Sequence, residues 1–446
     1  MKKTINIANG QGFWGDSVDA PKTLINNKNL DYLTLDYLAE VTMAIMQKQH
    51  NKDPKRGYAY DFVEFASHSV DQILENNIKI ITNAGGVNPY ACAENIKNRT
   101  NEKLKVAVVE GDNIIDKIDH YIDSGIKFDN LDNGKNILEI RDKICSANVY
   151  IDSYVVAEAL KHSPNIVLGG RITDPGLVVG PCLYEFGWDN MDYNKIAAAT
   201  VAGHILECGA QCTGGNHTRW WEIENFVDIG YPIVSISDNA LFDVHKDPKS
   251  GGLINKLTVT EQLLYEMGNP KKYLSPDVTV DFTSINLEDK NNNTVSVSNV
   301  KGMAPTDTFK VAINYISGYK ANGKLTVTAP YAKQKAEKIG EVIIDRLKRN
   351  DITFDEYKID YVGYNSCSAE TLPINKDCNE VTVSISVKDK EKAKIERFSK
   401  EIAPLITNGP PGITGFAGGR PKVQEVISYW PTLISKDIVN TNVRIY

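Results

Sequence analysis

The regular alternation of short apolar strands with helices in the first half of this chain constrains its fold most. Strand patterns cover residues 4–8, 32–35, 78–81, 106–109 and 166–168. Apolar residues at helical spacing lie between them, over residues 38–49, 65–75 and 154–161, and a further helix is expected to open at Pro89. Short strands that alternate with helices indicate a mostly parallel sheet with helices on both faces. We therefore predict a doubly wound α/β fold.

The second half of the chain has a different pattern. Strands are expected over residues 277–283, 294–300, 309–316, 324–328 and 381–387, and helices over 331–349 and 390–404. Residues 381–387 alternate strictly between apolar and polar, which is typical of a half-buried strand. Several strands beside two helices favour an α+β arrangement. The 446 residues are therefore expected to divide into an α/β domain, 1–235, and a smaller α+β domain, 236–446.

The composition excludes several classes of protein. The net charge is −7 and no basic stripe is present, which argues against a dedicated nucleic-acid-binding protein. No apolar run reaches the roughly 18 residues of a membrane-spanning helix, and the N-terminal residues lack the apolar core of a signal peptide. The seven cysteines are an odd number in a long chain, which favours reduced thiols. We expect a cytoplasmic protein without membrane or nucleic-acid partners and, on general grounds, an oligomer.

The loop after the first strand, residues 9–17 (NGQGFWGDS), contains the spacing Gly-x-Gly-x-x-Gly, and Asp36 lies 21 residues beyond its last glycine. This spacing is that of the dinucleotide fingerprint, so an NAD(P) site is one alternative. The bulky Phe13 and Trp14 and the acidic Asp16 disfavour it, because pyrophosphate needs small residues and no negative charge nearby. A loop whose backbone amides hold a substrate carboxylate or phosphate is favoured, and a tight turn is the third alternative. The candidate ligand-binding residues are Gly10, Gly12 and Gly15.

A second glycine-containing loop follows the third strand, over residues 82–89 (TNAGGVNP). Glycines permit close approach of the backbone to a ligand, and the helix that opens at Pro89 offers free N–H groups. Asn83, Gly85 and Gly86 are therefore candidates for an anion site. An ordinary connecting loop is the alternative.

The third loop, residues 169–174 (GGRITD), carries an arginine in a chain that has 10 Arg against 40 Lys. A chain that defaults to lysine is expected to keep arginine where a planar, bidentate fork is needed. Arg171 follows a buried strand and is a candidate clamp for a carboxylate or phosphate. Asp174 is a candidate to orient Arg171 or to act as an acid or base. A pair that only shapes the loop is the alternative.

The densest group of reactive residues lies over residues 203–219. His204, Glu207 and Cys208 are spaced so that one helix face presents all three, and His217 follows nearby. An acid–base pair of His204 and Glu207 is one interpretation, and His217 is an additional candidate. A divalent metal is another, although the spacing matches none of the usual zinc patterns. A core histidine satisfied by a neighbour is the third.

Several of these segments together resemble the acyclic-terpene-utilisation AtuA family. The similarity rests on residues 11–16, 82–86, 170–174, 203–216, 260–266 and 429–432, in order along the chain. It covers nearly the whole sequence, from about residue 1 to 435. The resemblance implies a role in the catabolism of branched carboxylic acids and their coenzyme A esters. It also implies a small partner subunit of about 100 residues, the size of one ordinary domain.

These observations lead to one favoured function and two alternatives. The favoured one is a lyase, a hydratase or dehydratase of a small branched (di)carboxylate or its coenzyme A ester. Arg171 and the loop with Gly85 would bind the acid group, and His204 and Glu207 would move protons, with a divalent metal as a candidate cofactor. The alternatives are a non-catalytic acyl-CoA-binding or scaffold subunit, and an NAD(P)-dependent oxidoreductase.

Overall fold

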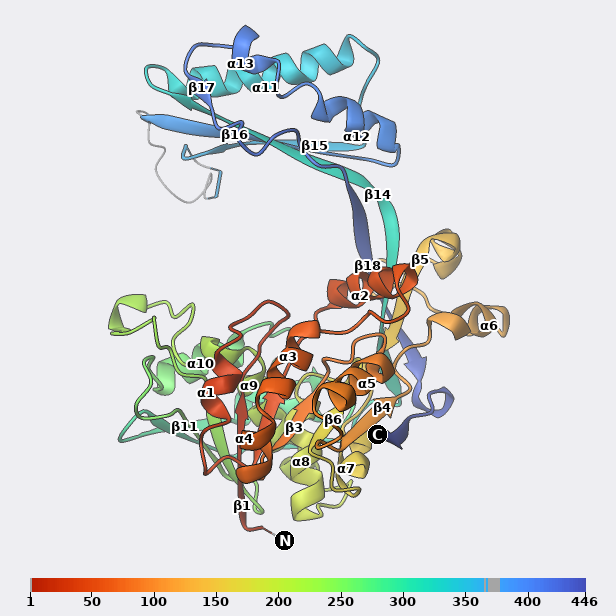
Figure 1. Ribbon diagram of the computed structural model, residues 1–446, viewed down its shortest axis with the longest axis vertical. Coiled ribbons are helices and arrows are strands. Elements are labelled where there is room, and N and C mark those ends of the chain that lie inside the picture. The colour runs from red at the N-terminus through yellow and green to blue at the C-terminus, as the bar shows by residue number, and fades with distance from the viewer. Residues whose placement is uncertain (1, 365, 368–377) are drawn as a thin grey trace. The chain divides into compact units, whose positions relative to one another are not determined.

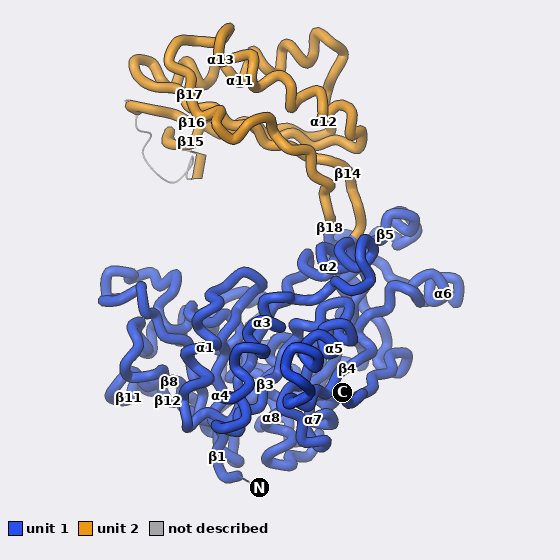
Figure 2. Tube along the Cα trace, viewed as in Figure 1, with its two compact units in different colours: residues 1–314, 429–446 blue, residues 315–428 orange. Residues whose placement is uncertain are grey.

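The computed structural model describes residues 2–364, 366–367 and 378–446. The described residues form two compact units (Figure 2). Unit 1 comprises residues 1–314 and 429–446, and unit 2 comprises residues 315–428. Unit 2 is thus an insertion within unit 1, entered and left through two paired strands, β14 (Thr308–Thr328) and β18 (Gln424–Ser435).

Unit 1 is built on a ten-stranded mixed sheet (Figure 1). Its parallel core has the order β1-β2-β3-β6-β4, with β1 Thr4–Asn9, β2 Tyr32–Leu35, β3 Lys79–Thr82, β6 Ile166–Leu168 and β4 Val106–Glu110. On one side β19 (Asn442–Ile445) pairs antiparallel with β4. On the other side four antiparallel strands follow β1, in the order β7 Ile233–Ser237, β8 Phe242–His245, β12 Thr294–Ser298 and β11 Asn286–Lys290. The expected α/β class, with a mostly parallel core, is confirmed.

Helices cover both faces of this sheet because the crossovers between parallel strands change direction. The first face is covered by α1 Ala20–Leu24, α2 Glu40–Lys52, α3 Tyr60–His68, α4 Val70–Glu75 and α5 Pro89–Arg99, whose apolar side chains share one buried core with β2 and β3. The second face is contacted by α7 Tyr154–Leu160, α8 Gly176–Phe186 and α9 Tyr193–Glu207. In the sheet, β6 lies between β3 and β4. The chain therefore crosses outward from β3 to β4 through α5 and returns from β4 to β6 through α7, which places α7 on the opposite face from α5.

The antiparallel extension explains why the expected division at residues 235 and 236 is not where the compact units meet. The second domain was expected to begin at residue 236, yet β7 spans that position, pairs with β1 over five residues and continues the sheet. Unit 1 also holds α6 Ile118–Asp123, β5 Ile144–Val149, α10 Lys256–Leu264 and a three-stranded sheet of β9 Tyr273–Leu274, β10 Thr279–Asp281 and β13 Lys301–Met303. The boundary falls instead at residues 314 and 315.

Unit 2 is a separate antiparallel sheet with helices on one side, which confirms the smaller α+β part (Figure 1). The strand order is β15 Glu356–Val362, β16 Glu380–Asp389, β14 and β17 Ile413–Thr414. Alternate residues of β16, among them Val383 and Ile385, are buried in one core with α11 Ala332–Lys348 and α12 Lys392–Ser399. A short α13, Leu405–Asn408, follows. In the part of the chain that is described, no helix has the length and apolar character needed to cross a membrane.

Four expected elements differ from those observed. The helix expected over 65–75 is two helices, α3 and α4, which meet at Ser69. The strand expected over 277–283 is the short β10 followed by a single helical turn. The strands expected over 309–316 and 324–328 are one strand, β14, which continues through Gly318 at a positive φ of 146°. A side chain other than glycine rarely adopts that conformation, so the position resembles a turn in the sequence.

Candidate functional site

A pocket of about 550 Å³ lies where the carboxyl ends of the parallel strands meet. This is the usual ligand position in open α/β sheets, and the volume suits a small molecule. Its lining comes from the loops after β1, β2 and β6, from the end of α9, and from two later segments. The charged and reactive residues that line it are Asp16, Asp36, Glu40, Arg171, Asp174, Glu207, Cys208, Tyr265 and Glu266.

Arg171 is the centre of the pocket's charge. Its side chain is only 2% exposed, and its two terminal nitrogens bond both carboxylate oxygens of Asp174. The guanidinium carbon lies 4.0 Å from the ring centroid of Tyr150. Burial acts to lower the pKa of Arg171, but the charge of Asp174 outweighs it, so the group stays charged. The remaining nitrogen, Nε, has no hydrogen-bond partner among the described residues.

The loop that carries Arg171 is held from behind by a buried carboxylate. Oδ2 of Asp112 accepts the backbone N–H of Arg171 at 2.8 Å and the side-chain amide of Asn148 at 3.1 Å. Burial raises the pKa of Asp112, although these hydrogen bonds oppose the change. Ile151 also holds this loop through its backbone, because it donates to the carbonyl of Arg171 and accepts from the N–H of Thr173. The position of the guanidinium is therefore set by backbone contacts as well as by Asp174.

Asp36, directly after β2, is a buried carboxyl group with a strongly shifted pKa. Burial raises that pKa well above its ordinary value, and the charge of Asp174 raises it further, against the opposing charge of Arg171. Its Oδ1 accepts hydrogen bonds from Nδ2 of Asn83 at 2.6 Å and from the backbone of Leu38. A carboxyl group whose pKa is raised by burial holds its proton more tightly than an exposed one, and is suited to the role of a general acid.

Glu207 and His204 form a hydrogen-bonded pair on α9, with Nδ1 of His204 2.8 Å from Oε1 of Glu207. Burial raises the pKa of Glu207, and the charge of His204 opposes it without reversing it. Burial acts to lower the pKa of His204, but Glu207 outweighs it, so the net change is upward. The ring of His204 packs against Tyr273 and Phe282. Within the described structure, neither Nε2 of His204 nor Oε2 of Glu207 has a hydrogen-bond partner.

Two glycines let these elements approach closely. A Cβ on Gly12 would lie 2.9 Å from the carbonyl carbon of Cys208, so only glycine lets the first loop cross the end of α9. A Cβ on Gly203 would lie 2.6 Å from the backbone of Pro175, which brings α9 against the loop of Asp174. The amide of Asn9 donates to the last carbonyls of α9 and satisfies them.

Glu40 extends the site at the first turn of α2. Its carboxylate accepts a hydrogen bond from the Tyr150 hydroxyl at 3.1 Å and lies 3.5 Å from Nζ of Lys310. Burial acts to raise the pKa of Glu40, but the helix backbone, Lys310 and Arg171 together lower it. The pKa of Glu40 is therefore shifted downward and that of Asp36 upward, so these two acids of the pocket differ in how readily they hold a proton.

Other predicted residues lie away from the pocket lining. His217 is buried, with Nδ1 2.8 Å from Glu261, and does not line the pocket. Gly85 and Gly86 are buried, where a Cβ would meet Gly169 and Met46, so they serve close packing of the loop. Asn83 contacts Asp36 and not the pocket itself.

Of the glycines in the first loop, Gly12 lines the pocket, whereas Gly10 packs on Pro21 and Gly15 turns the chain at a φ of 109°. Within the described residues, no group of three His, Cys, Asp or Glu side chains is arranged to hold a metal ion. The ligand and metal roles of these positions stay predictions.

Sequence reasoning missed the roles of Glu40, Asp112 and Tyr150, and considered Asp36 only as a nucleotide contact. A signal for Asp36 was present, because it directly follows a buried parallel strand. The same signal was present for Asp112, which lies two residues after the buried parallel strand β4. Tyr150 carries no such signal, since its place depends on how the 150–151 segment pairs with the Arg171 loop.

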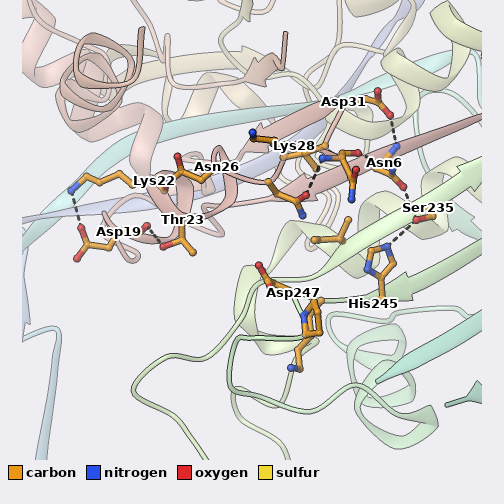
Figure 3. A pocket seen from close by; sticks show the side chains of 16 residues that line it. Asn6, Asp19, Lys22, Thr23, Asn26, Lys28, Asp31, Ser235, His245 and Asp247 are labelled. Atoms are coloured by element: carbon orange, nitrogen blue, oxygen red, sulfur yellow. Dashed lines mark hydrogen bonds and ion pairs between the residues drawn. The ribbon is translucent and has the colours of Figure 1, made fainter. Parts of the chain in front are cut away.

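A larger cavity of about 1180 Å³ lies beside β7 and β8 and contains a hydrogen-bonded serine and histidine (Figure 3). Nε2 of His245 lies 2.8 Å from Oγ of Ser235. The amide of Asn6 donates to the carbonyl of Asn29, so its Oδ1 accepts the proton of Ser235 at 2.6 Å. His245 must then donate to Ser235 and does not act as its base. The hydrogen bonds of Ser235, His245 and Asn6 thus satisfy one another, and they do not form a nucleophile and its base.

Comparisons with known proteins complete the description. A family model described as "Acyclic terpene utilisation family protein AtuA" matches residues 5–445. No curated protein sequence matches the chain. A crystal structure of S. aureus homoserine dehydrogenase at pH 6.5 aligns with 10% sequence identity over 92% of this chain and 84% of that chain. Its TM-score is 0.13, so the likeness supports no statement about fold or cofactor.

Proposed function

Because this chain belongs to the acyclic terpene utilisation family AtuA, we propose that it is a lyase that adds or removes water on a branched carboxylic acid or its coenzyme A ester. The reaction needs a base beside a carbon that carries a proton, an acid beside a hydroxyl group, and a donor for the carbonyl oxygen. The pocket at the strand ends contains a candidate for each. The proposal concerns unit 1, where all of these side chains lie.

The observation that carries the proposal is a pair of unsatisfied buried atoms that belong to two residues of the pocket lining. Nε of Arg171 is a charged donor and Oε2 of Glu207 is an acceptor, and neither has a partner among the described residues. Buried polar atoms are rarely left without hydrogen bonds, and the exceptions call for an explanation. A bound carbonyl compound would satisfy both, with its oxygen on Arg171 and its acidic C–H towards Glu207.

The proton steps follow from the pKa directions. In the dehydration direction, Glu207 removes the proton from the carbon beside the carbonyl group, while Nε of Arg171 donates a hydrogen bond to the carbonyl oxygen. Asp36, whose pKa is raised by burial, gives its proton to the departing hydroxyl, and water leaves. A C–H and a C–O bond break, and a C=C bond forms. His204 is a positioning residue, since it contacts Glu207 and not the pocket.

The net negative charge of the pocket limits which charge state of the substrate can bind. Of the described residues that line it, six are acids and one is a cation, and Asp174 already occupies both terminal nitrogens of Arg171. The carboxylate of a substrate would be repelled beside Arg171 unless it or one of the pocket acids were protonated. The reacting end is therefore best written as an uncharged thioester or protonated acid.

Proton NMR in D₂O tests the proposal directly. The purified protein is incubated with branched 3-hydroxy and 2-enoic acids and with their coenzyme A esters. We expect interconversion of hydroxy and enoic compounds and deuterium at the carbon beside the carbonyl group. Glu207→Gln should abolish both signals, because an amide does not accept the proton.

Glu261→Gln is the matched control, since Glu261 contacts His217 outside the pocket. The proposal is rejected if Glu207→Gln keeps the wild-type rate. It is also rejected if no compound is converted or deuterated while ligands still bind, a result that would favour a non-catalytic binding subunit.

A further inference from the structure

A third cavity in unit 1, of about 470 Å³, combines aromatic and cationic side chains. It lies between the loop after β1, the end of α2 and the start of α3. Its lining residues are Trp14, Gln49, Asp53, Lys55, Arg56, Tyr58 and Tyr60. It shares no lining residue with the candidate active-site pocket.

The aromatic side chains are held in place from outside the cavity. Nε1 of Trp14 donates to Oδ1 of Asp61 at 3.2 Å, and the ring packs on the edge of the unit 1 core. Tyr58 is buried and accepts a hydrogen bond from Nδ2 of Asn95 at 2.9 Å. Tyr60 is 45% exposed. The cavity therefore contains rings whose positions are set, with one partly open to solvent.

The cations belong to a short segment whose backbone is anchored. Nδ2 of Asn88 donates to the carbonyls of Pro54 and Arg56 at 2.8 and 2.9 Å. The Arg56 side chain is 71% exposed and lies 3.5 Å from Asp53. Lys55 has no ion-pair partner among the described residues. An anchored backbone that carries an unpaired lysine and a largely exposed arginine is suited to bind an anion without the entropic cost of ordering the loop.

We propose that this cavity binds the nucleotide portion of a ligand. A planar base would stack on Trp14, and the phosphates would contact Lys55 and Arg56. Bases stack on aromatic side chains with little dependence on their identity, and arginine and lysine are the usual partners of phosphate. The amide of Gln49, which also lines the cavity, would contact the ribose hydroxyls. An uncharged apolar ligand would leave the two cations unused.

One loop connects this cavity with the candidate active site. Phe13 lines the active-site pocket and Trp14, the next residue, lines the nucleotide cavity. A thioester of a nucleotide-containing coenzyme would place its acyl group in the first and its nucleotide in the second. This extension rests on the proposed function, whereas nucleotide binding itself does not. A free nucleotide and a coenzyme thioester share the chemistry that the cavity recognises.

Isothermal titration tests the cavity without requiring turnover. The full chain is titrated with ADP, with coenzyme A and with adenosine. We expect ADP and coenzyme A to bind, and adenosine to bind at least tenfold more weakly because it lacks phosphate. The double substitution Lys55→Ala with Arg56→Ala should weaken ADP binding at least tenfold and leave adenosine unchanged. Both side chains are exposed, so folding is not at risk.

Two further variants make the result specific. Trp14→Leu should weaken all three ligands about tenfold, and Trp14→Phe should restore most of the loss, because an aromatic ring still stacks. Lys52→Ala is the control, an exposed lysine at the end of α2 that does not line the cavity. The inference is overturned if neither ADP nor coenzyme A binds, or if the Lys55 and Arg56 double variant binds as the wild type does.

The two ligands also distinguish the sources of the nucleotide. Much tighter binding of coenzyme A than of ADP supports a coenzyme handle, whereas equal binding supports a free nucleotide. Failure of the lyase proposal shows as absent turnover with ADP binding intact. Failure of the nucleotide proposal shows as turnover that is unaffected by the Lys55 and Arg56 substitutions.

Discussion

Nδ1 of His204 lies 2.8 Å from Oε1 of Glu207, one turn apart on α9, and both side chains keep a second polar atom unsatisfied within the described structure. The histidine stands on the side away from the pocket lining, and the glutamate on the pocket side. Glu207 can therefore contact a ligand in the pocket, and His204 influences the charge of Glu207 from outside it.

The first prediction concerns the charge of Glu207. His204→Asn removes the charge and the hydrogen bond that oppose burial, so the pKa of Glu207 should rise further. The acid limb of kcat/KM should move to higher pH by the same amount. A ¹³C titration of the glutamate carboxyl groups measures the shift without turnover. An unchanged titration would show that His204 does not control Glu207.

The second prediction concerns the buried ion pair. Asp174→Asn leaves the Arg171 guanidinium, 2% exposed, without its counter-charge, and should destabilise unit 1 by about 3 kcal/mol. Urea unfolding followed by tryptophan fluorescence measures unit 1 alone, because all five tryptophans lie in it. Asp192→Asn breaks an exposed pair with Lys195 and should cost less than about 1 kcal/mol. Equal effects of the two substitutions would contradict the importance of burial.

The third prediction concerns Asp277, whose pKa is raised to about 7 from an ordinary 3.8 by burial and by the charge of Asp152, with Lys436 opposing. Native protein then binds more protons than unfolded protein between about pH 4 and 7. Stability from this group is therefore full below that window and is lost as pH rises through it, by at most about 1.4 kcal/mol per pH unit. Asp277→Asn should remove this slope.

Thermal unfolding of unit 1 at pH 5 and pH 7.5 measures the effect. The asparagine side chain of the Asp277→Asn variant has the size of the aspartate, and its oxygen can still accept from Ser153, which in the wild type donates to both carboxylate oxygens. Exposed Asp116→Asn serves as the control for the loss of one carboxyl group. The idea fails if the Asp277 variant retains the wild-type dependence on pH.

The fourth prediction concerns the crossing of the first loop over α9. Gly12→Ala would place a Cβ 2.9 Å from the backbone of Cys208, so it should destabilise unit 1 by about 1–3 kcal/mol and reduce ligand binding. Gly268→Ala is the control, since a Cβ there meets nothing within 4 Å. Tryptophan-detected urea unfolding compares them. A neutral Gly12→Ala would mean that the loop is free to move away from α9.

The sequence predicts the parallel core well because each strand there is a short apolar run followed by a polar loop. It predicts the convergence of those loops for the same reason, and the three-residue spacing of His204 and Glu207 predicts that they meet. It does not predict unit 2 as an insertion, because Gly318 interrupts the apolar pattern of β14 where the backbone does not turn. Nor does it predict Tyr150, whose place under Arg171 depends on contacts between segments distant in sequence.

The insertion of residues 315–428 has a consequence for how the protein is made. During translation the ribosome completes most of unit 1, then all of unit 2, and only afterwards releases β19, which covers the outer edge of β4. Until then that edge presents unpaired N–H and C=O groups, the usual starting point of strand-to-strand aggregation. Rapid folding of unit 2 would bring β18 back beside β14 and shorten the search of β19 for its partner. Early folding of the inserted unit would thus shorten the time for which the edge of β4 stays unpaired.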